Sequence, residues 1–369
     1  MFSNNHRRPV GRHMGTAQPV RPRIRPMLEA LELRIVPATV TSLADSGPGS
    51  LRDLVETAPA GDVIDFSTNL GDMPTITLTT GPILLPNSLT IDGGNNIRIS
   101  AGNDSRIFYD PNNTDKLIIQ NLTMEDGSAQ TKAAQDGGVK ADQGQGGAVY
   151  DLGNLILIND NFSSNSAATD GGAVYASGAV TVTNCSFMSN RAISGSGGAL
   201  YSFGALSVTG GSFVVNHASG NGGAIEYAHQ MTGPKDTATA ALANVSFSGN
   251  TAGNAGGAVS TVCAFMYLDP DSLTLVDEGG TAGFRITGCL FSGNGAKYGG
   301  GWYASIGNLA KGASSVTAMN DTFFRQLGRS RRRRNLLFAR LRQPPPVHVL
   351  AVVSYDHREY VGPTRRRCG

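Results

Sequence analysis

Residues 171–190 read GGAVYASGAVTVTNCSFMSN, and two phrases within this segment recur along the chain in step with each other. One phrase is Gly-Gly-Ala followed by an aliphatic residue, and the other is Phe-x-x-Asn. The first phrase begins at Gly146, Gly171, Gly197, Gly222 and Gly256, and in degenerate form at Gly300. Its spacing is 25 or 26 residues at first, then 34 and 44 residues. Two phrases with one shared period define an internal repeat, and the longer gaps predict insertions.

The segments between the phrases predict short strands. Val180-Thr181-Val182-Thr183 is typical, because it is rich in β-branched residues and partly alternating. A coil of about 25 residues with two or three such strands cannot bury its own apolar face, so neighbouring coils must stack. Parallel strands stacked about 4.8 Å apart place every residue over its counterpart in the previous repeat. We therefore predict an all-β chain folded as a single-stranded right-handed parallel β-helix, a solenoid of the pectin-lyase-like type.

In such a stack, recurring residues become internal ladders. The predicted aromatic stack consists of Phe162, Phe187, Phe213, Phe247 and Phe291. The predicted amide ladder consists of Asn165, Asn190, Asn216, Asn250 and Asn294. A second column, three residues before the Phe, holds Asn159, Asn184, Asn244 and Asn320, with Gly210 and Gly288 in the gaps. We expect the ladder Asn residues at a turn, where Asn tolerates left-handed backbone and its amide bonds the coils above and below.

The β-helix is predicted to span residues 40–324, with the clear repeats in 146–324. Residues 40–60 are predicted to form an N-terminal cap, because Ser50-Leu51-Arg52-Asp53 resembles a capping box and starts a short helix that ends near Ala58. Stretches expected to project as loops are the inserts near 228–241 and 263–283 and the polar, Gly-rich residues 128–144.

Two basic segments flank an acidic body. Residues 1–39 hold 7 Arg against 2 acids, and residues 325–369 hold 12 Arg against 2 acids. Residues 40–324 hold 11 Lys and Arg against 24 acids, a sign that does not favour nucleic-acid binding, which needs clustered cations. No stretch approaches the roughly 18 apolar residues of a membrane-spanning helix, so none is predicted. We expect residues 1–39 to be a disordered basic export segment.

The segment 325–369 departs from the repeat. Asn320-Asp321-Thr322-Phe323 begins another copy, but an Arg-rich and Pro-rich sequence follows where a further Asn and a Gly-Gly phrase are due. Glycine codons of the type GGC read in another frame give CGG, which encodes Arg. A frameshift just after Phe323 is therefore our hypothesis. The alternatives are a disordered basic tail that binds nucleic acid or a membrane, and a linker containing Pro344-Pro345-Pro346.

The two phrases resemble the repeats of polymorphic outer-membrane proteins, chlamydial-type surface proteins and their bacterial relatives with a β-helical passenger. This resemblance covers about residues 146–324. Residues 40–66 resemble the initial segment of secreted β-helix proteins, with TSLADSGPGSLR at 41–52 and GDVIDF at 61–66. Residues 31–38, LELRIVPA, resemble a short element near the start of planctomycete surface proteins. Together these resemblances imply export and an extracellular, cell-surface or outer-membrane location.

A polysaccharide lyase or hydrolase on this fold would need acids on adjacent coils together with Arg, Lys or His. Asp151, Asp160 and Asp170 lie on one coil without counterparts on the next two. Arg191 and Arg285 are isolated in the repeats, and His217 and His229 are single residues that we expect in turns or loops, without a catalytic role. Cys185 and Cys289 share a repeat position three coils apart, so we predict buried free thiols and no disulfide. No catalytic residue is predicted.

Two weaker ligand signals remain. Asp269, Asp271, Asp277 and Glu278 in the second insert are candidate Ca²⁺ ligands, although their spacing departs from the known loop motifs. No other cofactor is predicted. Tyr150, Tyr175, Tyr201 and Tyr227 recur about one coil apart. They predict either an exposed stripe for stacking sugars or, as we favour, a half-buried ladder packed on itself.

The sequence therefore predicts an exported, non-enzymatic surface or extracellular protein. Its β-helix would serve as a rigid spacer and as a display surface for adhesion or for contact with glycans, with a polysaccharide or cell-surface ligand as partner. The alternative is a carbohydrate-active enzyme of the pectin-lyase-like type that acts on acidic polysaccharide. That alternative requires a cluster of acids and bases on adjacent coils, in residues 61–145 or in the insert at 263–283.

Overall fold

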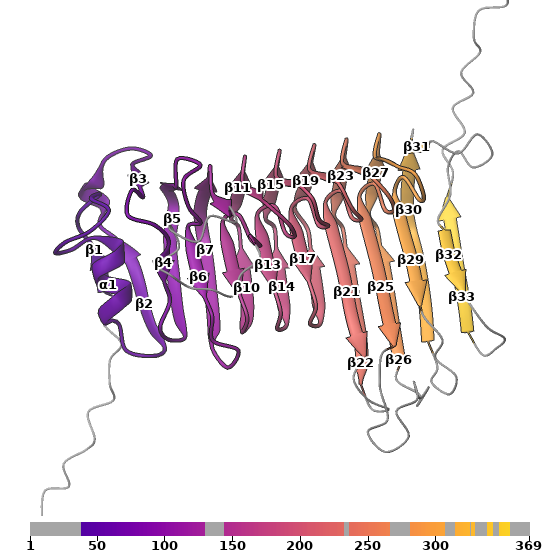
Figure 1. The fold of residues 1–369 in the computed structure, drawn as a ribbon, viewed down its shortest axis with the longest axis horizontal. Helices are drawn as coiled ribbons and strands as arrows, with labels where there is room; N and C mark the ends of the chain where they lie inside the picture. Colours follow the sequence, from indigo (N-terminus) through magenta and orange to yellow (C-terminus); the bar gives the residue numbers. More distant parts are fainter. Residues whose placement is uncertain are drawn as a thin grey trace, which may run out of the picture. The chain divides into compact units, whose positions relative to one another are not determined.

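The computed structural model describes residues 38–129, 144–231, 236–265, 281–306, 314–324, 326–328, 338–341 and 347–354. The chain divides into two units, Met1–Ile35 and Val36–Gly369, and every described residue belongs to the second. These residues form stacked coils of parallel strands around one apolar core (Figure 1). The prediction of an all-β parallel β-helix is confirmed.

The strands of the described residues belong to three parallel sheets. Sheet 1 contains β1 (Ala38–Val40), β2 (Asp62–Phe66), β3 (Thr75–Thr77), β5 (Leu89–Ser100), β7 (Lys116–Glu125), β10 (Asn154–Ile158), β11 (Asn161–Ser163), β14 (Val180–Thr183), β15 (Ser186–Met188), β18 (Leu206–Thr209), β19 (Ser212–Val214), β22 (Thr237–Ala243), β23 (Ser246–Ser248), β26 (Thr281–Thr287), β27 (Leu290–Ser292), β30 (Ser314–Phe324) and β33 (Val347–Ser354). Sheet 2 contains β4 (Ile83–Leu84), β6 (Phe108–Asp110), β9 (Val149–Asp151), β13 (Val174–Ala176), β17 (Leu200–Ser202), β21 (Ile225–Met231), β25 (Val259–Phe265), β29 (Trp302–Ile306) and β32 (Phe338–Leu341). Sheet 3 contains β8 (Ser128–Ala129), β12 (Ser166–Ala167), β16 (Arg191–Ala192), β20 (His217–Ala218), β24 (Thr251–Ala252), β28 (Gly295–Ala296) and β31 (Leu327–Gly328). A helix, α1 (Leu51–Thr57), and a 3-10 turn, η1 (Thr68–Leu70), precede the repeats.

One coil runs through β13 in sheet 2, β14 and β15 in sheet 1, and β16 in sheet 3. Each strand pairs with its counterpart one coil away, so that Val180 lies between Leu155 and Leu206. Successive side chains of a strand point to opposite faces, so β14 buries Val180 and Val182 and exposes Thr181. The repetition of this pattern produces one continuous aliphatic core inside the coils.

Left-handed backbone occurs in two columns of turn residues. In the first column, Asn159, Asn184, Asn244 and Asn320 have φ between 54° and 57°, and Gly210 and Gly288 have φ of 67° and 66°. The second column is the residue before each ladder Asn: Ser164, Ser189, Val215, Gly249 and Gly293, with φ between 54° and 65°. The expectation that the ladder Asn residues themselves adopt left-handed backbone is wrong. Their neighbours bend the chain, which leaves the ladder amides free to bond between coils.

Val215 is the strained member of the second column. It is a β-branched residue with φ of 54° and is 57% exposed. Left-handed backbone costs such a residue about 1–2 kcal/mol, whereas Asn visits this region readily. We expect Val215→Asn to raise the free energy of unfolding by about 1 kcal/mol, measured by denaturant titration. Ser189→Asn, at the same place one coil earlier, should change little, and an equal gain in both variants would contradict the strain argument.

The cap at the N-terminal end of the core consists of β1, α1 and the segment between them (Figure 1). β1 starts at Ala38, two residues before the predicted start of the β-helix, and pairs with β2. The Ser50 hydroxyl accepts a hydrogen bond from the Asp53 backbone N–H at 3.2 Å and so caps α1. Leu51 and Val55 of the helix are buried in the core, which the helix therefore shields from solvent.

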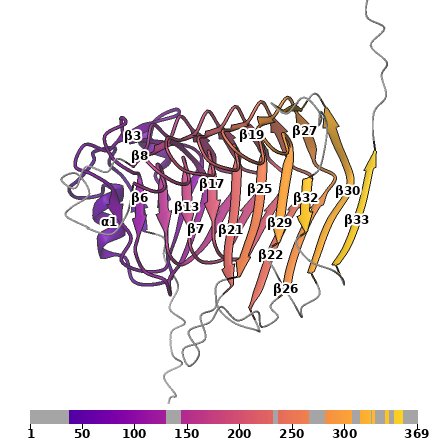
Figure 2. The same cartoon turned by 45° about the vertical axis from the view of Figure 1, so that its right-hand side comes forward.

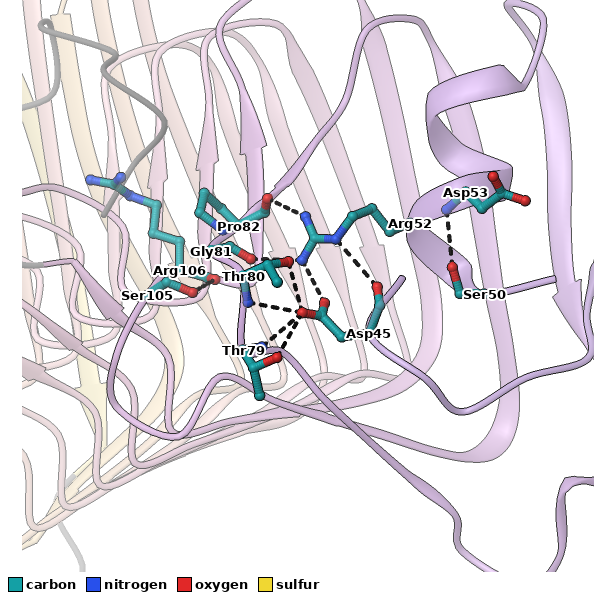
Figure 3. A network of polar contacts seen from close by, with 10 residues as sticks. All are labelled: Asp45, Ser50, Arg52, Asp53, Thr79, Thr80, Gly81, Pro82, Ser105 and Arg106. Atoms are coloured by element: carbon teal, nitrogen blue, oxygen red, sulfur yellow. Dashed lines mark hydrogen bonds and ion pairs between the residues drawn. The ribbon is translucent and has the colours of Figure 1, made fainter. Parts of the chain in front are cut away.

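A polar network fixes this cap to the first coils (Figure 3). Asp45 Oδ2 accepts four hydrogen bonds, from the backbone N–H and the hydroxyl of both Thr79 and Thr80, at 2.7–3.0 Å. Asp45 Oδ1 pairs with Arg52 Nη2 at 2.6 Å, and Arg52 also donates to the carbonyls of Gly81 and Pro82. Burial raises the pKa of Asp45, but the bonds from Arg52, Thr79 and Thr80 outweigh it and lower the pKa to about 2.

We expect Asp45→Ala to lower the free energy of unfolding by about 2–3 kcal/mol, because five donors lose their charged acceptor. Since the pKa of Asp45 is lowered on folding, its contribution is complete above the ordinary value of 3.8 and is lost as the pH falls toward 2. Urea unfolding of the wild type and Asp45→Asn between pH 2 and 6 measures this. Equal pH slopes in the two proteins would contradict it, and Glu56→Gln on the exposed side of α1 is the control.

The stretches expected to be inserted loops are partly strand. Near 228–241, β21 continues to Met231 and β22 begins at Thr237; near 263–283, β25 continues to Phe265 and β26 begins at Thr281. These strands extend past the ends of β13 and β17 (Figures 1 and 2). The pattern of alternate burial continues in β22, so the residues of this strand lengthen the coil. In the third expected loop, Ser128 and Ala129 form β8, and 130–143 lie outside the described residues.

The repeat continues beyond Phe323. Phe323 stacks on Phe291 with ring centroids 4.6 Å apart. Gln326 occupies the ladder position, and its Nε2 donates to the Phe291 carbonyl at 2.7 Å. In the segment 325–369, β31, β32 and β33 pair in parallel with the preceding coil. The expectation that residues 325–369 are frameshifted or disordered stays a prediction, and sequencing of the gene tests the frameshift.

Candidate functional site

The predicted amide ladder lies inside the coils. Asn216 shows the pattern: its Oδ1 accepts from the backbone N–H and from Nδ2 of Asn190 at 2.9 and 3.0 Å. Its Nδ2 donates to the Phe187 carbonyl at 3.0 Å and to Asn250 Oδ1 at 2.9 Å. All five ladder Asn residues are at most 1% exposed. The ladder therefore joins coils and is closed to a ligand.

The predicted aromatic stack is also internal. Its five Phe rings lie parallel, with neighbouring centroids 4.5–5.2 Å apart. Each ring is at most 1% exposed. Such offset stacks add to the apolar burial of the ring, so this column contributes to the stability of the coil stack.

The Tyr column differs from the predicted one at both ends. Tyr109, Tyr150, Tyr175 and Tyr201 stack at 5.1–5.5 Å on the side of sheet 2 away from the core. Tyr227 is not a member, because Tyr201 pairs with Glu226 in the next coil. The Tyr227 ring is fully buried and packs edge-on against Phe284. The first three rings are 4–7% exposed, so the column is a ladder packed on itself and does not form an open stripe for sugars.

Charged side chains flank this Tyr column. At one end, the Arg106 guanidinium lies 5.7 and 5.6 Å from the ring centroids of Tyr109 and Tyr150, and its Nε donates to the Gln145 carbonyl. At the other end Glu226, 3% exposed, takes the place of a Tyr. Burial raises the pKa of Glu226 to about 8, and the nearby Asp170 adds to this rise. Both groups are largely shielded from solvent.

Two carboxyl groups on adjacent coils face the interior, a feature that we call the carboxyl pair. Asp110 of β6 pairs in register with Asp151 of β9, and both are fully buried. Asp110 Oδ1 accepts from the Asn112 backbone N–H at 2.9 Å. Within the described part of the chain, Asp110 Oδ2 and both oxygens of Asp151 have no well-formed hydrogen bond, although the Gly153 amide partly stabilises the Asp151 carboxylate. Burial raises the pKa of Asp110 to about 6, and burial together with the charge of Asp110 raises that of Asp151 to about 8.

The carboxyl pair does not emerge when Asp151 is compared only with the coils that follow it. The signal lies upstream, where Phe108-Tyr109-Asp110 has the same pattern as Val149-Tyr150-Asp151. The pair meets the requirement for acids on adjacent coils. It points into the core, however, so it does not supply the solvent-facing acids on which the enzyme alternative depends.

A His–Asp contact lies where the strands of sheet 2 lengthen. His229 Nε2 is 3.2 Å from Asp236 Oδ1, and its Nδ1 is 2.7 Å from the Phe203 carbonyl oxygen. Cys263 is the in-register neighbour of His229 on β25. Burial raises the pKa of the Cys263 thiol to about 12, with a further rise from Asp236, so this thiol is not an activated nucleophile. Contrary to the expected loop contexts, His217 and His229 both lie in strands.

The remaining candidates do not form a site in the described residues. Cys185 and Cys289 are buried free thiols. Arg191 and Arg285 lie in β16 and β26. In the described ranges, no group of three or more His, Cys, Asp or Glu side chains is placed to hold a metal ion. The candidate Ca²⁺ ligands Asp269, Asp271, Asp277 and Glu278 lie outside these ranges.

The outer face of sheet 1 has an unusual composition over the middle coils. Eight strands, β10, β11, β14, β15, β18, β19, β22 and β23, contain no Asp, Glu, Lys or Arg. Apart from Met188, which is 51% exposed, the exposed side chains on these strands are small or carry a hydroxyl or amide group, as at Asn161, Thr181, Ser207 and Ala241. Corresponding positions on neighbouring coils are in register, so Thr181 pairs with Ser207 and Thr183 with Thr209. We call this surface the hydroxyl face.

Comparison with known proteins adds one similarity. A family model described as the Chlamydia polymorphic membrane protein repeat matches residues 161–177 and 244–262. The two matches cover the same part of two coils, from the Phe strand in sheet 1 to the following strand in sheet 2. Searches of curated proteins and of solved structures find no match. No helix in the described ranges is long and apolar enough to cross a membrane. At these two coils the chain is thus similar to the repeats of a membrane-protein family.

Proposed function

We propose that this chain is an exported surface protein whose β-helix serves as a rigid spacer and displays a face for contact with glycans. The observation that carries the proposal is the match of two coils to the polymorphic membrane protein repeat. In our proposal the chain resembles that family in location as well, at the outer membrane or cell surface. The internal ladders of Asn and Phe suit a spacer, because every coil is bonded to its neighbours.

The hydroxyl face supports contact with an uncharged polymer. Residues 40–324 carry a clear excess of acids, yet eight successive strands of sheet 1 present no charge. Sugar chains bind through hydroxyl hydrogen bonds, and a face of in-register Thr and Ser side chains offers donors and acceptors for them. A neutral polysaccharide would meet no repulsion there, whereas an acidic one would meet the negative charge of the surrounding body.

Retention on immobilised polysaccharides tests this proposal. We expect the full chain to be retained by at least one neutral polymer and to release no new reducing ends or unsaturated uronates. Thr181→Glu and Ser207→Glu should each weaken retention several-fold, because they place a charge on the hydroxyl face. Ile193→Glu, which adds the same charge beyond β16 at a residue that is 41% exposed, is the matched control.

Two outcomes would overturn the proposal. Release of cleavage products would make the chain an enzyme, and the candidate ligands Asp269 and Asp271 would then be the first residues to replace. Equal losses in the face variants and in Ile193→Glu would show that the hydroxyl face is not the contact surface. Labelling of intact source cells with a membrane-impermeant reagent tests the surface location separately.

A further inference from the structure

The carboxyl pair has no part in the proposed function, yet its burial requires an explanation. An ionised carboxylate without a partner in an apolar interior is costly, so such groups are paired, coordinated or protonated. Within the described part of the chain, the in-register neighbours of Asp110 and Asp151 supply no positive charge. Ala176 lies one coil on from Asp151, and Leu85 follows β4 on the other side of Asp110. Both are apolar and buried.

The titratable group that acts on the pair from the adjacent turn is another carboxyl group, so its charge is also negative. Asp115, between β6 and β7, raises the pKa of both Asp110 and Asp151. Among the described residues, no Lys, Arg or His contributes to either shift, and the nearby Lys116 is exposed. Since none of these described side chains compensates the negative charge of the pair, a bound proton is the positive charge that can do so.

We propose that Asp110 and Asp151 form a proton-binding site that holds the N-terminal coils to the repeat array. The pair retains a proton at neutral pH, so that one carboxyl O–H is available to donate to the other carboxylate. At alkaline pH this proton passes to solvent, and two negative charges then lie about one strand spacing apart, about 4.8 Å, in the core. The contact between β6 and β9, where the irregular coils meet the first clear repeat, weakens as a result.

The sign of the pH dependence follows from the direction of the two shifts. Both pKa values are raised above the ordinary value of 3.8, to about 6 and about 8. The stabilisation is therefore complete below pH 3.8 and is lost as the pH rises through the two raised values. Each pKa unit of difference between folded and unfolded states changes the unfolding equilibrium constant tenfold.

Unfolding of the full chain by urea from pH 5 to pH 9 tests the proposal. Asp151→Asn replaces the protonated acid by a neutral side chain of the same shape. We expect the unfolding constant of the wild type to rise at least about a hundredfold more over this range than that of Asp151→Asn. Glu56→Gln, which removes an exposed carboxyl group from α1, should follow the wild type. Equal pH dependence in the wild type and Asp151→Asn would overturn the proposal.

Two measurements on the wild type remain decisive if Asp151→Asn does not fold. Carboxyl ¹³C resonances of Asp110 and Asp151 should titrate well above the ordinary range, and midpoints near pH 4 would overturn the proposal. At pH 9, amide hydrogen exchange in β6 and β9 should be faster in the wild type than in Asp110→Asn. An increase spread evenly over all coils would contradict the proposed location of the site. If EDTA lowers the stability at pH 8 and Ca²⁺ restores it, the pair binds a cation and the proton site is excluded.

Discussion

Replacing Asn216 by Ala is expected to lower the free energy of unfolding by about 3–5 kcal/mol. The substitution removes the acceptor for the Asn190 backbone N–H and Nδ2, and the donor to the Phe187 carbonyl. These groups are buried, so each one left without a partner costs about 1–3 kcal/mol. Asn216 is in the middle of the ladder, and both adjoining coils lose bonds at once. Urea unfolding followed by far-ultraviolet circular dichroism measures the loss.

Asn216→Asp is the matched variant for the ladder. It keeps the acceptor for Asn190 but places a carboxylate opposite two further acceptors, the Phe187 carbonyl and Asn250 Oδ1. Protonation would restore one donor, so the stability of this variant should increase as the pH falls, relative to the wild type. A loss below 1 kcal/mol in Asn216→Ala, or a pH-independent Asn216→Asp, would contradict the role of the ladder.

Replacing Gly198 by Ala is expected to cost about 3 kcal/mol or more. A Cβ at this position would contact the Gly223 carbonyl oxygen and would lie 2.6 and 2.7 Å from the backbone C and N of His217. These are backbone atoms of the next coil, so relief requires the coils to move apart and not merely a side chain to rotate. Thermal unfolding should show a clear drop in the melting temperature.

Gly283→Ala is the control for this experiment. The nearest atom to a Cβ at Gly283 is Ser315 Oγ at 3.9 Å, an ordinary contact, and the residue lies in β26. The same chemical change should therefore alter the free energy of unfolding by less than about 1 kcal/mol, with a gain if chain entropy dominates. Equal losses in the two variants would show that the packing of the Gly-Gly corner is not the cause.

The period of the two phrases was sufficient to predict the fold. Phe187 pairs with Phe162 and Phe213 because both lie one repeat away, and this register follows from the spacing alone. The shape of the longer coils was harder to predict. Ala238, Ala240 and Leu242 alternate with exposed residues as a strand requires, but the broken repeat spacing suggested a loop.

The prediction of the site failed at residues that lie outside the regular phrases. Tyr227 is one residue later in its phrase than Tyr201, and one residue in a strand reverses the side chain from the outer face to the core. Asp110 lies in a coil without either phrase, so its alignment with Asp151 required the register of β6 and β9. Burial and charge then determine what such residues do, and neither is visible in a repeat pattern.

The ladder bonds are the same from coil to coil, and this has a consequence for the evolution of the chain. Asn165 bonds Asn190 as Asn190 bonds Asn216, with separations of 25 and 26 residues. A recombination event that joins residue 165 directly to residue 191 would delete one turn of the solenoid and bring Asn165 opposite Asn216 with all partners restored. Gene length can thus change by one whole turn, of 25 or 26 residues in this part of the array, while the ladder on either side of the junction stays intact.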